Sequence, residues 1–71
     1  MKKEIIIEGM SCGHCVKRVE NALKGLDGAK QVAVILEENK AVIESDVEIS
    51  DDVLKETVDD AGYDVVSIQT L

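Results

Sequence analysis

Alternating apolar and polar residues predict three strands in the first two thirds of the chain. The first strand covers Lys3–Glu8. Residues 30–36 and 41–46 alternate in the same way, and the short polar run 37–40 between them is typical of a hairpin turn. The side chains expected to face inward in these strands are Ile5, Ile7, Val32, Val34, Leu36, Ala41 and Ile43.

Two other segments carry apolar residues at three- and four-residue spacing, which predicts helices with one buried stripe each. The first helix follows Ser11 and the second follows Ser50, and both serines are expected to serve as N-caps. Gly62 is expected to end the second helix. The expected stripes are Val16, Val19, Ala22, Leu23 and Leu26 in the first helix, and Val53, Leu54, Val58 and Ala61 in the second.

A last strand is expected over residues 64–70, where the pattern fits two registers. One register turns Val66 and Ile68 inward, and the other turns Val65 and Ser67 inward. The resulting order is βαββαβ, and each βαβ half needs a right-handed crossover. This order predicts an α+β, ferredoxin-like, open-faced sandwich, with a four-stranded antiparallel sheet and two helices on one face.

Length and composition fit one small domain, residues 1–71. Tyr63 is the only aromatic residue, so the chain has no stacking platform for single-stranded nucleic acid. The formal charge of −7 also argues against nucleic acid and against anionic membrane surfaces as partners. The longest early apolar run has three residues, too short for a signal peptide or a membrane span. A cytoplasmic location is therefore the default expectation.

Charge is unevenly distributed along the chain. Residues 1–30 carry six basic and four acidic side chains, whereas residues 31–71 carry two basic and eleven acidic ones. Lys17, Arg18 and Lys24 of the first helix are expected to meet an acidic partner face. The alternative interpretation is an ordinary solvated surface.

Candidate chemistry is concentrated between the first strand and the first helix, where Cys12, His14 and Cys15 lie. Thiolates are soft ligands suited to Cu(I), zinc and similar ions, and a helix N-terminus favours their negative charge. In a cytosolic protein, a CxxC pair is more often metal-binding or redox-active than a structural disulfide.

A CxxC pair occurs in several kinds of site. A closed zinc site takes four ligands, whereas this chain offers two thiols and His14, which adjoins Cys15 in a tight loop. A thioredoxin-type dithiol would face a cis-proline, and the chain has no proline. An open two-thiolate site remains, which favours Cu(I) and leaves Ag(I) and Hg(II) open. Zinc, cadmium or lead would need further ligands.

The stretch Gly9-Met10-Ser11-Cys12-Gly13-His14-Cys15 resembles the GMxCxxC signature of heavy-metal-associated domains. The resemblance extends through the βαββαβ order to Ala61-Gly62-Tyr63-Asp64 and is strongest to bacterial copper chaperones of the CopZ kind. Related domains occur at the N-termini of copper-exporting P-type ATPases and in mercury-binding periplasmic proteins. Zinc-transporting relatives usually carry Asp where this chain has Ser11, so the resemblance favours zinc less than copper as the bound metal.

The resemblance implies a role for each residue of the loop. Cys12 and Cys15 are the implied metal ligands, and Met10 is implied to point inward and support the loop. His14 is implied to be exposed and to tune the site, or to bind metal in a metal-bridged dimer. Tyr63 corresponds to a tyrosine near the metal loop of bacterial copper domains, and it can equally cap the core.

The expected function is that of a carrier and not of an enzyme. It is monomeric without metal and delivers Cu(I) to the metal-binding domain of a copper-transporting P-type ATPase, or to a copper-responsive regulator. One alternative is a domain of a heavy-metal P-type ATPase that handles copper, or less readily mercury, zinc or cadmium. Another is a dithiol redox protein with a reversible Cys12–Cys15 disulfide.

Overall fold

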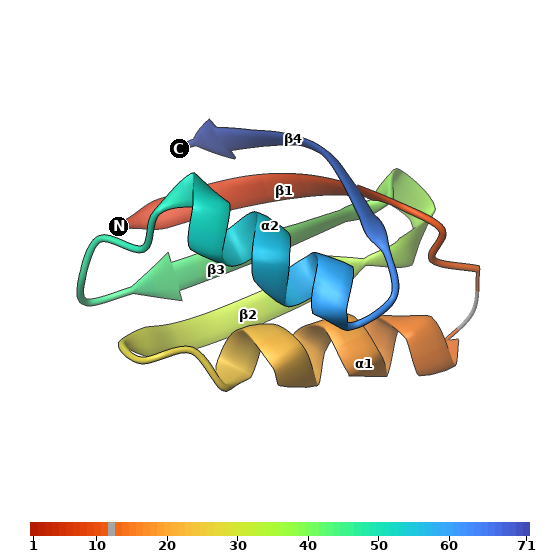
Figure 1. Ribbon diagram of the computed structural model, residues 1–71, viewed down its shortest axis with the longest axis horizontal. Helices are drawn as coiled ribbons and strands as arrows, with labels where there is room; N and C mark the ends of the chain where they lie inside the picture. Colours follow the sequence, from red (N-terminus) through yellow and green to blue (C-terminus); the bar gives the residue numbers. More distant parts are fainter. Residues whose placement is uncertain (12) are drawn as a thin grey trace.

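Strands and helices follow one another in the predicted βαββαβ order in the computed structural model, which describes residues 1–11 and 13–71 (Figure 1). A short 3-10 turn, η1, joins the second and third strands. The elements are β1 Lys2–Glu8, α1 Gly13–Lys24, β2 Ala29–Ile35, η1 Leu36–Glu38, β3 Lys40–Ser45, α2 Asp51–Asp60 and β4 Asp64–Thr70.

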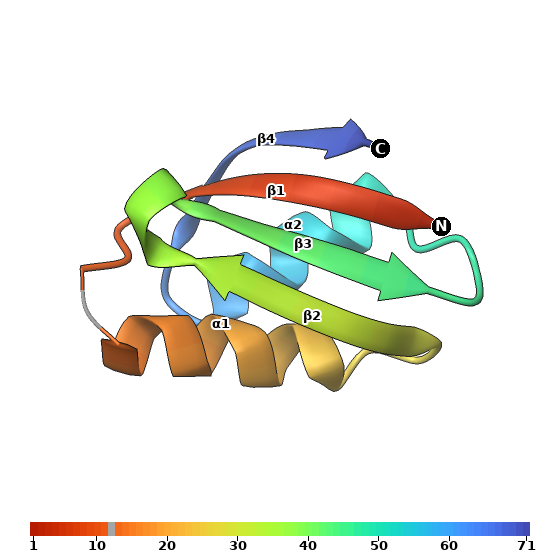
Figure 2. The same ribbon diagram turned by 180° about the vertical axis from the view of Figure 1, so that it is seen from behind.

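The strands form one antiparallel sheet in the order β2-β3-β1-β4. Both helices cover the same face of this sheet, and its other face is open (Figure 2). This arrangement confirms the predicted ferredoxin-like sandwich. None of the helices in the described residues is long and apolar enough to cross a bilayer.

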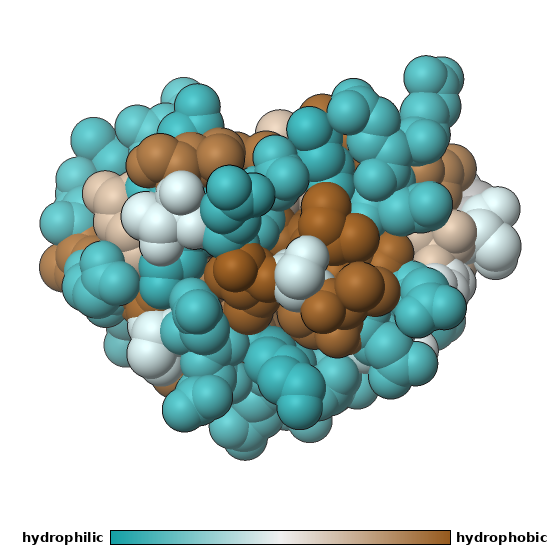
Figure 3. Space-filling model, turned by 90° about the horizontal axis from the view of Figure 1, so that it is seen from above, coloured by the Kyte–Doolittle hydropathy of each residue, from teal (hydrophilic) through white to brown (hydrophobic). Residues whose placement is uncertain are grey.

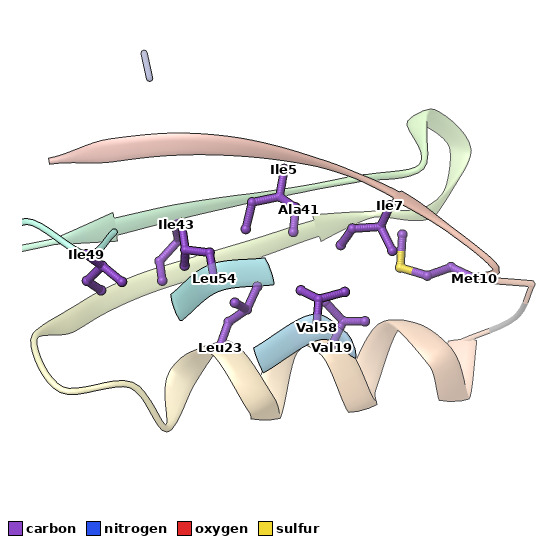
Figure 4. Packing of buried hydrophobic residues seen from close by; sticks show 10 residues of the cluster. All are labelled: Ile5, Ile7, Met10, Val19, Leu23, Ala41, Ile43, Ile49, Leu54 and Val58. Atoms are coloured by element: carbon purple, nitrogen blue, oxygen red, sulfur yellow. The ribbon is translucent and has the colours of Figure 1, made fainter. Parts of the chain in front are cut away.

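The core lies between the sheet and the two helices (Figure 4). The central strands β1 and β3 supply side chains with no exposed surface, at the inward positions predicted from alternation. Each helix adds two fully buried residues of its predicted stripe. The fully buried residues are Ile5, Ile7, Ala41, Ile43, Val19, Leu23, Leu54 and Val58.

Val53 was expected in the buried stripe of α2, but its side chain is 43% exposed. Leu54 and Val58 lie four residues apart and both face the sheet. Val53 precedes Leu54 by one residue, which rotates its side chain about 100° around the helix axis, towards solvent. The prediction of Val53 as a core residue was therefore wrong.

Both ends of α2 have the residues that were predicted to begin and end it. The Ser50 hydroxyl accepts a hydrogen bond from the Val53 backbone N–H at 3.3 Å, which satisfies one of the free donors of the first turn. Gly62 has a φ of +99°, and its N–H donates to the Asp59 carbonyl at 2.9 Å. Both predictions are confirmed, so a cap and a glycine define the helix.

Strand β4 fits neither of the two strict registers. Ile5 pairs with Ile68, but Ile7 pairs with Val65, so β4 uses one residue more than β1 over this stretch. Both Val65 and Ile68 consequently pack against the core, whereas Val66 is 58% exposed. The edge that carries β4 shows an apolar patch enclosed by hydrophilic side chains (Figure 3).

The β2–β3 connection lies where the polar run predicted a turn. Leu36 belongs to η1 and not to the end of the strand, so the expected strand end was one residue too long. Asn39 then adopts a left-handed conformation with φ of 53°. Asparagine tolerates this conformation better than most residues, which allows the chain to reverse tightly.

Candidate functional site

Cys15 lies in the first turn of α1, where the chain passes from β1 into the helix. Its side chain is half-buried. This position favours a thiolate, because unpaired backbone N–H groups and the helix dipole supply positive charge. Cys12, the other predicted metal ligand, lies outside the described residues.

Two hydroxyl groups surround the Cys15 thiol. The Ser11 hydroxyl oxygen lies 3.9 Å from the Cys15 Sγ, and either group can donate. The Tyr63 hydroxyl also interacts with this thiol: the hydrogen bond to Cys15, followed by desolvation, raises the pKa of Tyr63, while Arg18 acts in the opposite direction. The N-cap role expected of Ser11 stays a prediction, because the residue between Ser11 and α1 lies outside the described part.

Met10 points into the protein. Its side chain is 7% exposed and belongs to the core cluster, and it extends from the loop towards Ile7 (Figure 4). The thioether therefore anchors the loop to the core by packing, with its sulfur facing apolar neighbours. Cys15 and Tyr63 pack against the same cluster from its edge.

The Tyr63 ring lies beside Gly9, the first residue of the loop. A Cβ atom at Gly9 would lie 3.5 Å from the Tyr63 Cδ1, an ordinary contact distance, so ring and backbone are close neighbours. Gly9 itself has a φ of +98°, in the region that favours glycine. The resemblance to heavy-metal-associated domains predicted Tyr63 near the loop, but no local pattern in the sequence indicated its contact with Gly9.

His14 is exposed at the start of α1. In the described part of the chain, no three His, Cys, Asp or Glu side chains come together in an arrangement that could hold a metal ion. Lys17 and Arg18, one turn further along α1, are exposed beside the same end. The surroundings of Cys15 thus supply soft sulfur and neutral hydroxyls, a donor set that suits a soft ion better than Mg²⁺ or Ca²⁺.

Comparison with known families gives one match that covers most of the chain. The heavy-metal-associated domain model matches residues 4–64. That segment begins in β1, includes the whole loop between β1 and α1, and ends where β4 starts.

Individual relatives agree with this match. The copper chaperone CopZ of Staphylococcus aureus is 41% identical over 68 residues, which cover 93% of this chain and 100% of that protein. A solved structure described as CopZ metallochaperone has a TM-score of 0.87 at 37% identity, covering 93% of this chain and 100% of its own. A copper binding domain from a P-type ATPase has a TM-score of 0.84 at 28% identity, covering 99% of this chain and 100% of its own.

Proposed function

The chain belongs to the heavy-metal-associated domain family, and from that premise we propose that it is a Cu(I) carrier and not an enzyme. In this proposal Cys12 and Cys15 hold the metal as two thiolates. The receiver is the metal-binding domain of a copper-transporting P-type ATPase or a copper-responsive regulator. The identity to CopZ and the likeness to a P-type ATPase domain support copper as the cargo.

The observation that carries the proposal is the setting of Cys15. Its thiol lies in the first turn of α1, at one end of the molecule, with the hydroxyls of Ser11 and Tyr63 beside it. Hydroxyl groups can donate to a thiolate without competing as hard, charged ligands. Cu(I) accepts two sulfurs in a near-linear arrangement, so two thiolates are enough to hold it. A copper ion held in this way is under-coordinated and has room for a third ligand.

Because the copper is under-coordinated, it can pass to a receiver by ligand exchange. A cysteine of the receiver adds to the copper as a third thiolate, and one of the two original thiolates then leaves. Repeating the exchange moves the ion without releasing it into water. Copper stays Cu(I) throughout, so no oxidant or reductant takes part. The thiols must stay reduced, which suits the cytosol.

The other loop residues have supporting roles in this proposal. Met10 fixes the loop to the core, and Tyr63 lies beside Gly9 while its hydroxyl interacts with Cys15. His14 is outside the ligand set of the monomer and can become a ligand when copper bridges two molecules. Ag(I) and Hg(II) are expected to substitute for Cu(I), and zinc is expected to bind less well.

Stoichiometric titration under anaerobic, reducing conditions tests the proposal. We expect one Cu(I) per monomer, and Cys12→Ser and Cys15→Ser should each abolish tight binding. His14→Ala is the matched control, because it changes an exposed loop residue and should retain most of the affinity. Tight binding that survives either serine substitution would refute the two-thiolate site.

A second candidate is that the chain acts as the metal-binding domain of a larger copper transporter. The likeness to a P-type ATPase domain, which covers 99% of this chain, favours it. The metal chemistry would be the same, but copper would then pass to a site within one polypeptide. Sequencing the complete reading frame separates the two candidates directly.

A further inference from the structure

Arg18 lies on the same face of α1 as Cys15, one turn further along the helix. Residues at this spacing are neighbours on a helix surface. Arg18 also lines a hollow between α1 and the end of α2, together with Asp60 and Ala61. The turn that continues from Ala61 to Tyr63 lies beside α1 (Figure 1). Arg18, Tyr63 and Cys15 thus come from two separate segments and form one cluster at the metal-loop end of the molecule.

The fold holds the Tyr63 ring within this cluster. The backbone N–H of Tyr63 donates to the Val58 carbonyl at 3.3 Å, which ties the residue to the end of α2. The ring lies beside Gly9, and both Tyr63 and Cys15 pack against the hydrophobic core. The position of the ring is therefore set by packing, and what remains to be set is the direction in which its hydroxyl donates.

The chemistry of the three groups sets that direction. A guanidinium carries N–H donors and no acceptor, so Arg18 can only donate to the Tyr63 oxygen. The hydroxyl proton is then left for the Cys15 sulfur. The pKa of Tyr63 responds as this direction requires: the hydrogen bond to Cys15 raises it most, because the donated proton is held, and the Arg18 guanidinium lowers it.

No carboxylate of the described residues holds the Arg18 guanidinium instead. None of the ion pairs formed within residues 1–11 and 13–71 includes Arg18, although Asp60 lines the same hollow. Lys24, at the other end of α1, does have such a partner, because its ammonium lies 3.3 Å from the Glu20 carboxylate. The Arg18 donors are therefore available to the Tyr63 hydroxyl.

We propose that Arg18 is a positioning residue for Cys15, because it donates to the Tyr63 oxygen and so directs the hydroxyl proton onto the Cys15 sulfur. A hydroxyl that accepts a hydrogen bond from a cation is polarised and becomes a stronger donor itself. A thiolate that accepts such a bond is a weaker nucleophile and a better leaving group, because its negative charge is already stabilised. Arg18 thus acts on Cys15 through Tyr63.

The consequence for metal transfer rests on the proposed copper transport. When a thiolate of the receiver adds to the copper, one of the two original thiolates departs with its negative charge. A hydroxyl that already points at the Cys15 sulfur stabilises this charge, so Cys15 departs more readily than it would without Arg18. This effect differs from electrostatic steering, because it persists at high salt and with an uncharged acceptor.

Alkylation of Cys15 tests the positioning role without copper. In metal-free, reduced Cys12→Ser protein, Cys15 is the only thiol. Uncharged iodoacetamide at about pH 9.5 measures the nucleophilicity of its thiolate, because most of the thiol is then ionised. Tyr63→Phe removes the donor and should raise the rate about threefold, and Arg18→Leu should raise it about twofold. In the Tyr63→Phe background, Arg18→Leu should have no further effect.

Two results of this cycle would overturn the proposal. One is an unchanged rate in Arg18→Leu, and the other is an Arg18→Leu effect that persists in Tyr63→Phe, which would show that Arg18 acts by charge alone. Lys17→Leu is the matched control, because Lys17 is the exposed cation next to Arg18 on α1 and its loss changes the net charge equally. It should change the alkylation rate less than Arg18→Leu does.

NMR of Tyr63 gives a spectroscopic signature of the same contact. Because Tyr63 is the only tyrosine, ¹³C-labelled tyrosine gives a single Cζ signal in the full chain. This signal should shift in Arg18→Leu and stay in place in Lys17→Leu. An unshifted signal in Arg18→Leu, or equal shifts in the two variants, would overturn the proposal.

Copper release is measured with dithiothreitol, an uncharged acceptor, at high salt. Wild-type protein loaded with Cu(I) should release the metal about twofold faster than Arg18→Leu, whereas Lys55→Leu on α2 should behave as wild type. Equal release from wild type and Arg18→Leu would overturn the role in transfer. Failure of the wild-type protein to take up Cu(I) would refute the proposed function, while alkylation and NMR would still decide the role of Arg18.

Discussion

At the scale of single residues, the site depends on contacts between parts of the chain that are far apart in sequence. Tyr63 follows α2, yet its ring lies beside Gly9 and its hydroxyl interacts with Cys15. Periodicity reports which face of an element is buried, but it contains no information about a contact of this kind. The local roles of Ser50 and Gly62, by contrast, could be predicted because caps and turns act over three or four residues.

Gly9 provides a stability prediction at this scale. Gly9→Ala should destabilise the fold by about 1–2 kcal/mol, because a Cβ at φ of +98° is strained. Crowding is a minor contribution, since the nearest side-chain atom would be 3.5 Å away, on Tyr63. Urea unfolding measures the change.

Gly25→Ala is the matched control for this substitution. A Cβ at Gly25 would make only ordinary contacts, at 3.5 Å and 3.7 Å from two carbonyl oxygens of α1. We expect it to be neutral or slightly stabilising. A loss at Gly9 no larger than that at Gly25 would show that the backbone of the loop relaxes without strain.

At the scale of elements, alternation and helical spacing were sufficient for the order of strands and helices and for most buried faces. They failed where the geometry departs from a strict period. The extra residue in β4 breaks its alternation, so no single register could be correct for both Val65 and Ile68. Val53 was misassigned because a short stripe is compatible with more than one rotation of α2 about its axis.

Lys3 is an element-scale feature that pattern analysis did not identify, because a lysine at the start of a strand is normally solvated. Its side chain ties β1 to the N-terminus of α2. Lys3→Met should destabilise the fold by about 1–3 kcal/mol, because the Ile49 carbonyl and the Asp51 carboxylate lose their donor. Lys55→Met, on the exposed surface of α2, removes the same charge and should change stability by less than about 0.5 kcal/mol.

The contribution of Lys3 to the free energy of unfolding should decrease at high pH. The hydrogen bond to Asp51, and the nearby Glu48, raise the pKa of Lys3 above its ordinary value of 10.5 despite the opposing effect of burial. A raised pKa in the folded state means that the stabilisation is complete below pH 10.5 and is lost as pH rises through the folded-state value. The difference in unfolding free energy between wild type and Lys3→Met should therefore be constant at neutral pH and shrink above pH 10.5. A difference that grows with pH would contradict this assignment.

At the scale of the whole molecule, basic and acidic side chains occur together at both ends. Lys17 and Arg18 are exposed on α1 beside Cys15, and the acidic residues Glu37 and Glu38 of η1 lie at the same end of the molecule. Net charge and its division along the sequence indicated a basic first part and an acidic second part. How these charges are divided between the two ends of the molecule could be found only from the three-dimensional arrangement.

The two exposed basic residues next to Cys15, Lys17 and Arg18, predict how copper transfer responds to charge. Replacing Lys17 and Arg18 together by Glu should slow transfer to an acidic receiver by about tenfold at low salt, because steering is lost. Copper affinity should change little, since neither residue is a proposed ligand. Stopped-flow transfer at low and high salt is the measurement, with Lys55→Glu as the control. Equal rates in wild type and the double variant would show that the α1 face is only solvated.

The central claim is that two thiolates at the β1–α1 junction make this family member a Cu(I) carrier. Competition between Cu(I) and Zn(II) for the metal-free protein, under anaerobic and reducing conditions and followed by native mass spectrometry, tests it most directly. We predict a one-to-one Cu(I) complex that forms in the presence of excess zinc, and no such complex with Cys12→Ser. A one-to-one zinc complex that persists when Cu(I) is added would contradict the claim.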